Sequence, residues 1–63
     1  MYFEIYSTVG GLLGVQQWRW RLKGANHEII ASGEGYNSKE ACLHGISLLQ
    51  ATNTQTPIRQ VFA

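Results

Sequence analysis

The sequence predicts an α+β fold in which a β-β-β-α-β unit forms an antiparallel sheet with one helix packed on one face. The first reason is the segment 16–23, where apolar and polar side chains alternate at every position from Gln17 onward. A strand sends successive side chains to opposite faces, so Trp18 and Trp20 belong to a buried face. The second reason is the segment 39–52, where apolar residues recur at helical spacing.

The length of the chain favours a single domain, residues 1–63, that works as a homodimer. A chain of 63 residues buries only about 60% of the surface that its unfolded form exposes, so a monomer is marginally stable. Small domains compensate with disulfides, metal ions or partner chains. Cys42 is the one cysteine, which excludes an intrachain disulfide and a thiol-rich metal site. We therefore expect oligomerisation to supply the stability that a monomer of this size lacks.

Charge and hydropathy give no reason to expect a membrane or a strongly anionic partner. The formal net charge is +1, too small for a general attraction to nucleic acid or to an anionic membrane. The first residues lack the basic start and apolar core of a signal peptide. No apolar run approaches the roughly 20 residues that a membrane span needs. Together with the lone cysteine, these features predict a protein of the reducing cytoplasm.

The first two strands are expected to form a hairpin. Residues 2–7 read as a strand whose Phe3 and Ile5 join the tryptophan face. Glu4 then lies across from Arg19 and Arg21, and opposite charges on neighbouring strands stabilise a sheet.

The glycine-rich segment Val9–Val15 between these strands is read as a turn, yet it is unusually apolar. Its leucines either fold back on the core or lie on a partner chain. The alternative is an exposed apolar patch that binds a ligand or a protein.

The second half of the chain predicts a strand, a bend and a helix. Residues 24–26 form a tight turn, residues 27–33 the third strand, and residues 33–36 a bend. Ser38 caps a helix that runs from Lys39 to about Thr52, with Asn37 as the competing cap. Gly45 lies within the apolar stripe of this helix, which indicates a close approach of the helix to the sheet, with a tryptophan as a candidate neighbour.

The C-terminal residues predict a short fourth strand after a polar connector. Residues 52–56 are polar, Pro57 can stand at the start of a strand, and residues 58–62 contain Ile58, Val61 and Phe62. A short strand behind such a connector permits exchange between chains. We therefore expect residues 57–62 to pair with a second copy of the chain.

The residues with reactive side chains do not form a recognisable active site, so no catalytic residue, cofactor or metal ligand is predicted. Cys42 and His44 are two positions apart on the helix and do not face one another. Cys42 lies in the apolar stripe of the helix, which favours a packed thiol. His27 lies beside a turn and is expected to be solvated. Glu28 and Glu34 are read as surface carboxylates rather than catalytic acids.

The wet face of the sheet is the one candidate binding surface. Basic residues and tyrosines are interleaved on this face, at Tyr2, Tyr6, Arg19, Arg21 and Lys23. Such surfaces stack bases and follow phosphates in several nucleic-acid-binding folds. The alternative is that Glu4 and Glu28 neutralise the basic row and leave the face simply solvated, which agrees with the small net charge. Weak binding of single-stranded nucleic acid is thus the second hypothesis, after an interaction module.

Several stretches in one register are similar to the YegP-like family of small bacterial proteins. They are Phe3-Glu4-Ile5-Tyr6, Trp18-Arg19-Trp20-Arg21-Leu22-Lys23, Glu28-Ile29-Ile30-Ala31-Ser32, Glu34-Gly35-Tyr36, Ser38-Lys39, Cys42 and Gly45-Ile46. The resemblance covers roughly residues 2 to 50. It implies a β-β-β-α-β unit that occurs as tandem repeats or as two single-unit chains, which share one antiparallel sheet and swap their C-terminal strands. A chain with one unit is then a homodimer.

Two segments depart from the family pattern. Residues between Tyr6 and Trp18 are more numerous and more apolar than the usual polar hairpin. Residues after about 52 offer little motif to match, so the resemblance supports the shared sheet more than the exchanged strand. The family is a domain of unknown function, and it supplies no catalytic or binding residues for this chain.

Overall fold

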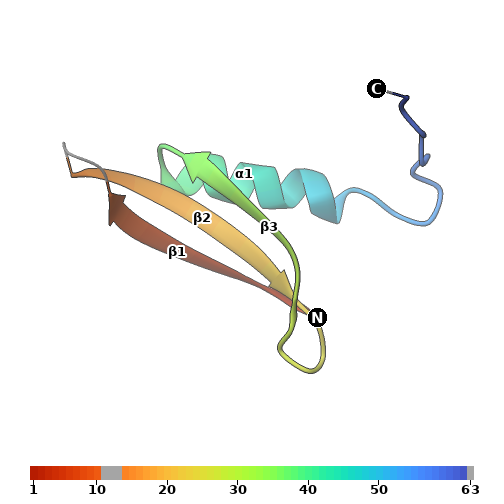
Figure 1. The fold of residues 1–63 in the computed structure, drawn as a ribbon, viewed down its shortest axis with the longest axis horizontal. Coiled ribbons are helices and arrows are strands. Elements are labelled where there is room, and N and C mark those ends of the chain that lie inside the picture. The colour runs from red at the N-terminus through yellow and green to blue at the C-terminus, as the bar shows by residue number, and fades with distance from the viewer. Residues whose placement is uncertain (11–13, 63) are drawn as a thin grey trace.

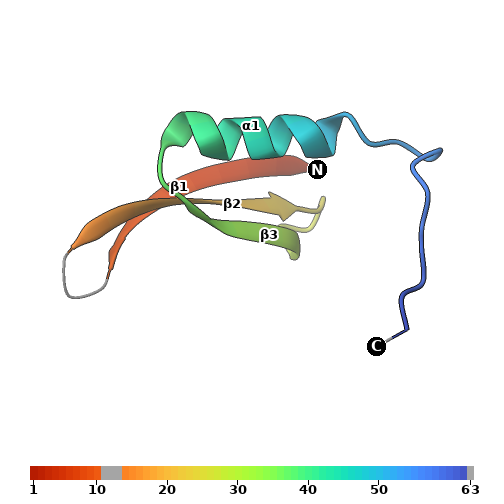
Figure 2. The same cartoon turned by 90° about the horizontal axis from the view of Figure 1, so that it is seen from above.

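The computed structural model describes residues 1–10 and 14–62. Three strands, β1 (Tyr2–Gly10), β2 (Val15–Lys23) and β3 (Ile29–Tyr36), form one antiparallel sheet in the order β1-β2-β3. The helix α1 (Lys39–Gln50) lies on one face of this sheet, and the opposite face is open (Figures 1 and 2). The α+β fold expected from the sequence is confirmed.

The register of β1 with β2 places the expected residues opposite each other. Ile5 pairs with Trp20, Phe3 with Leu22, and Glu4 with Arg21. Both strands are longer than expected, because β1 continues past Ser7 to Gly10 and β2 begins at Val15. Val9, Gly10 and Val15, at the two ends of the predicted turn, therefore belong to the strands of the hairpin. The central leucines of this turn, residues 12 and 13, lie outside the described residues.

Strand β3 differs from the sequence-based prediction at both ends. It begins at Ile29 rather than residue 27, because His27 has a φ of 64° and its N–H donates to the Gly24 carbonyl in a turn. It also continues through Gly33 and Gly35 to Tyr36, so the predicted bend at residues 33–36 is wrong. Glycine in a strand often marks a close approach of another group. At Gly33 that group is the indole of Trp20, whose Nε1 would lie 2.3 Å from an added Cβ.

Helix α1 begins as the sequence predicts and ends slightly earlier. The Ser38 hydroxyl accepts a hydrogen bond from the Ala41 N–H at 3.0 Å, so Ser38 is the N-cap. Gly45 does allow a close approach to the sheet, but the neighbour is the Tyr36 ring rather than a tryptophan. Within residues 1–10 and 14–62, no helix is both long and apolar enough to cross a membrane.

The core lies between α1 and β2 and is small. Among residues 1–10 and 14–62, the buried apolar residues are Trp20, Cys42 and Ile46. The half-buried apolar residues around them are Phe3, Ile5, Trp18, Leu22 and Tyr36. The tryptophan face and the face of Phe3 and Ile5 are therefore the same, as expected.

The C-terminal residues leave the helix and extend away from the sheet (Figures 1 and 2). The connector forms a hydrogen-bonded turn, in which the Thr56 N–H donates to the Asn53 carbonyl and the Gln55 N–H donates to the Asn53 side chain. Residues 57–62 form no strand in the single chain. The sheet of the single chain thus has the three strands described above, and the exchange of a fourth strand stays a prediction.

Candidate interaction surfaces

The open face of the sheet brings together the five residues that the sequence singled out. Tyr2 pairs with Lys23 and Tyr6 pairs with Arg19, while Arg21 lies between them on β2. The Arg21 guanidinium lies 4.9 Å from the centre of the Tyr6 ring, within the range of a cation–π interaction. The basic and aromatic side chains are therefore neighbours, as the alternation predicts.

Carboxylates form ion pairs with the three basic side chains of this face. Glu4 Oε1 lies 2.7 Å from Arg21 Nε and 3.2 Å from Lys23 Nζ. Glu34 Oε2 lies 2.7 Å from Arg19 Nη1. Glu28 was expected from the sequence to be the second neutralising residue. The structure instead assigns that role to Glu34, which faces β2 because β3 continues past Gly33.

These ion pairs shift the protonation equilibria of their members. The hydrogen bond from Arg21, and then that from Lys23, lower the pKa of the Glu4 carboxyl. The same hydrogen bond to Glu4 raises the pKa of Arg21. Glu4 is therefore ionised at neutral pH. Its carboxylate and that of Glu34 face three cations, so these five groups have a formal net charge of +1, the same as the whole chain.

Tyr2 and His27 form a contact that the sequence did not reveal. The Tyr2 hydroxyl lies 2.7 Å from His27 Nδ1, and the two rings meet edge to face with centres 5.9 Å apart. His27 is exposed, as expected, but it is not solely a solvated side chain. His27 has a positive φ, and its ring lies against Tyr2 of β1. No local sequence pattern signals this contact.

The thiol of Cys42 lies apart from these surfaces. Cys42 is fully buried in the core, and burial raises the pKa of its thiol, so it is a poor nucleophile at neutral pH. Among the residues that the structure describes, no group of three or more histidine, cysteine, aspartate or glutamate side chains gathers in a way that could hold a metal ion.

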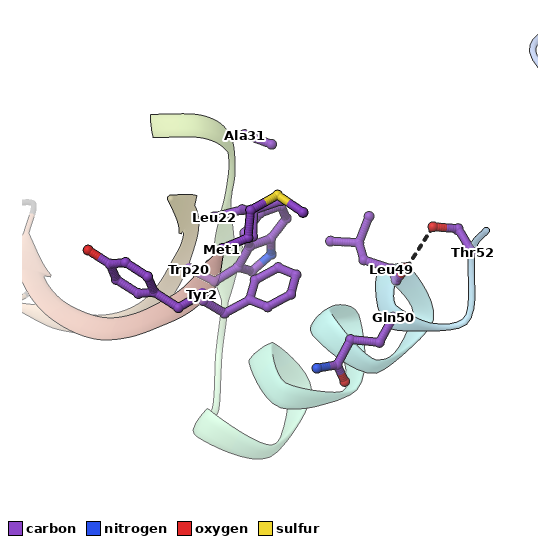
Figure 3. A pocket seen from close by; sticks show the side chains of 9 residues that line it. Met1, Tyr2, Trp20, Leu22, Ala31, Leu49, Gln50 and Thr52 are labelled. Atoms are coloured by element: carbon purple, nitrogen blue, oxygen red, sulfur yellow. Dashed lines mark hydrogen bonds between the residues drawn. The ribbon is translucent and has the colours of Figure 1, made fainter. Parts of the chain in front are cut away.

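A groove of about 680 Å³ lies where the end of α1 faces the sheet. Its walls come from the start of β1, the end of β2, Ala31 of β3 and the residues around the C-terminus of α1. Figure 3 shows the Leu49 side chain pointing from the helix across the open space toward the side chains of Leu22 and Met1. The lining is mainly apolar. We call it the α1 groove.

Apolar surface also lies along β3, which is one of the two edge strands of the sheet. Strand β3 pairs with β2 on one side only, and its Ile29 and Ile30 are 58% and 53% exposed. Val9 and Val15, at the far end of the hairpin, are exposed as well. The sequence signal for this apolar edge is the unbroken apolar run 29–31. In a strand with one wet face, apolar and polar residues alternate, and in this run they do not.

The chain matches the family model described as a domain of unknown function, DUF1508, over residues 15–60. This match includes β2, β3, α1, the connector and the start of the C-terminal segment. It extends further toward the C-terminus than the motifs quoted above.

Relatives of similar length occur in several organisms. A UPF0339 protein of Neisseria meningitidis serogroup B is 54% identical over 61 residues, which cover 97% of this chain and 100% of the relative. A UPF0339 protein of Treponema denticola is 37% identical over 59 residues, 94% of this chain and 93% of the relative. A UPF0339 protein of Methanosarcina acetivorans is 43% identical over 44 residues, 70% of this chain and 67% of the relative. None of these names states an activity.

Proposed function

Because the chain belongs to the DUF1508 family of UPF0339 proteins, whose function is unknown, we propose from its surfaces that it is a homodimeric interaction module. In this proposal two copies exchange their C-terminal segments, residues 57–62. The similarity to the YegP-like family, which is this same family, is confirmed by the comparisons. They give no indication of enzymatic activity.

The observation that carries the proposal is the exposure of the C-terminal segment. Ile58, Val61 and Phe62 are 100%, 86% and 85% exposed in the single chain. Burying apolar surface contributes about 25 cal/mol per Å², so a partner that covers these side chains gains binding energy. Large apolar side chains clustered in six residues are typical of an interface rather than of a solvated tail.

A second copy of the chain offers a matching surface. The open edge of β3 has unpaired backbone groups and two exposed isoleucines, Ile29 and Ile30. An edge of this kind accepts an added strand. When two copies each donate a segment to the other, the contact closes with two-fold symmetry and both segments are covered. The small core explains why the chain benefits from this additional burial.

Truncation of the full chain after Thr52 tests the proposal. We expect the full-length protein to sediment as a dimer and the truncated protein to sediment as a monomer with a lower melting temperature. The expected loss follows from the removal of all three apolar side chains of the segment. A truncated protein that sediments as a dimer and melts at the temperature of the full-length protein would show that other surfaces join the chains.

Binding of single-stranded nucleic acid to the open face is the second candidate. The observation in its favour is the stacking of Arg21 on Tyr6 beside Arg19 and Lys23. The pairing of these cations with Glu4 and Glu34 weakens it, because phosphate binding depends on unpaired positive charge.

We expect tryptophan and tyrosine fluorescence of the wild-type protein to stay unchanged during titration with a short single-stranded oligonucleotide at low salt. The matched variant replaces Glu4 and Glu34 by Gln, which frees the basic row without changing side-chain shape. Saturable, salt-sensitive binding by the wild type that Arg19→Ala together with Arg21→Ala abolishes would make nucleic-acid binding the function of this face.

A further inference from the structure

We propose that the α1 groove is the receptor site for the C-terminal aromatic residue of a second copy, so that the partner's Phe62 inserts between α1 and the sheet. This inference rests on the proposed exchange of residues 57–62 and adds to it the site that recognises the exchanged segment. The open β3 edge supplies backbone pairing, and the groove selects the side chain.

The chemistry of the groove fits an apolar aromatic occupant. Phe3, Leu22 and Leu49 line it together with the indole of Trp20. The one polar atom of that indole, Nε1, already donates a hydrogen bond to the Tyr36 hydroxyl at 3.1 Å. The indole therefore offers no free donor to a polar ligand. Phe3 already meets Trp20 edge to face, with ring centres 5.8 Å apart, and a second aromatic ring extends this cluster favourably.

The spacing of the C-terminal segment places two apolar side chains on the same side. In an extended strand Ile58 and Phe62 share one face and Val61 lies on the other. The Cα atoms of Ile58 and Phe62 are then about 13 Å apart, at the usual rise of about 3.3 Å per residue. Ala31 of β3 lines the groove, and the two residues before it in the chain, Ile29 and Ile30, are exposed apolar side chains of the same strand. A segment with Phe62 in the groove can thus place Ile58 on further apolar surface.

The connector directs the segment of the same chain away from this groove. Thr52 borders the groove, so the segment starts beside it. The turn at residues 53–56 is closed by hydrogen bonds of Asn53 with Gln55 and Thr56, and Pro57 follows directly. Figures 1 and 2 show the chain continuing away from both α1 and the sheet after this turn. The segment is thereby presented to another copy, while its own groove stays open.

Disulfide trapping in the full-length protein tests this arrangement. The test variant carries Leu49→Cys and Phe62→Cys, and the matched control carries Leu49→Cys and Arg59→Cys, because residue 59 lies on the opposite face of the segment. Cys42 is buried and remains in both proteins. After mild oxidation, we expect the test variant to form a covalent dimer on a denaturing gel and the control to remain largely monomeric.

The outcomes separate this inference from the proposed exchange. A disulfide within one chain would show that the segment returns to its own groove, and it would overturn the inference. A test variant that sediments as a dimer but forms no disulfide would overturn the groove assignment alone. A wild-type protein that sediments as a monomer would overturn both the groove assignment and the exchange.

A second measurement uses substitutions that leave the groove intact. Phe62→Ala should raise the dissociation constant of the dimer roughly a hundredfold or more, from the cost of truncating a buried phenylalanine. Val61→Ala, on the other face, should raise it much less. Equal effects of the two substitutions would show that Phe62 does not occupy a dedicated site.

Discussion

Replacing Trp20 by Ala is expected to unfold the protein at room temperature. Trp20 is the large side chain of the core, 6% exposed, and it contacts Phe3, Gly33 and Tyr36 on both neighbouring strands. Truncating a buried tryptophan costs about 3–5 kcal/mol. Domains are stable by roughly 0.05–0.15 kcal/mol per residue, which is about 3–9 kcal/mol for 63 residues, so this one substitution removes a large part or all of the stability.

Far-UV circular dichroism during heating measures this effect, with wild type and variants at the same protein concentration because dimerisation shifts the melting temperature. Val9→Ala is the matched control, since Val9 is an exposed apolar residue of the same hairpin. We expect the control to melt close to the wild type. A Trp20→Ala variant that melts with the control would mean that Trp20 does not lie beneath α1.

The features predicted correctly from the sequence are those that local patterns determine. Strict alternation in β2 identified the buried tryptophan face, and the same period placed Glu4 opposite Arg21. A hydroxyl residue just before an apolar helical stripe identified Ser38 as the N-cap. In each case the relevant partner lies within the same element or directly across a hairpin, so the sequence contains the necessary information.

The features that were missed depend on contacts between distant residues. Gly33 and Gly35 were read as a bend because glycine commonly marks turns. In the structure Gly33 stays in β3 because the Trp20 indole crosses it, and the continuation of β3 brings Glu34 to Arg19. The neighbour of Gly45 could not be identified for the same reason, since Tyr36 reaches the helix only after β3 has paired with β2.

The candidate site was predictable on one face and not on the other. The basic and aromatic residues of the open face follow from strand alternation, although the role of Glu34 does not. The α1 groove has no signature in the sequence, because its walls come from four separate parts of the chain. Its existence depends on where α1 ends relative to the sheet, which is a property of the packed structure.

Gly33→Ala is the second substitution with a large expected effect. An added Cβ would lie 2.3 Å from Nε1 and 2.5 Å from Cε2 of Trp20. The indole has little freedom to move, because α1 covers it and its Nε1 is bonded to Tyr36. Overpacking of this kind costs about 1–3 kcal/mol. Replacing glycine by alanine in a compatible backbone gains only about 0.4–1 kcal/mol, so the net effect is destabilising.

The matched control for Gly33→Ala is Gly10→Ala, which makes the same change in β1. Among the described residues other than its chain neighbours, no atom lies within 4 Å of the Cβ added there. We expect Gly10→Ala to be neutral or slightly stabilising in urea unfolding and Gly33→Ala to shift the midpoint to lower urea. The double variant Gly33→Ala with Trp20→Phe should lose less stability than the sum of its single changes, because the smaller ring leaves room for the methyl group. Additive effects, or equal midpoints for the two alanine variants, would show that the indole does not pack on Gly33, and the account of why β3 continues through its glycines would then be wrong.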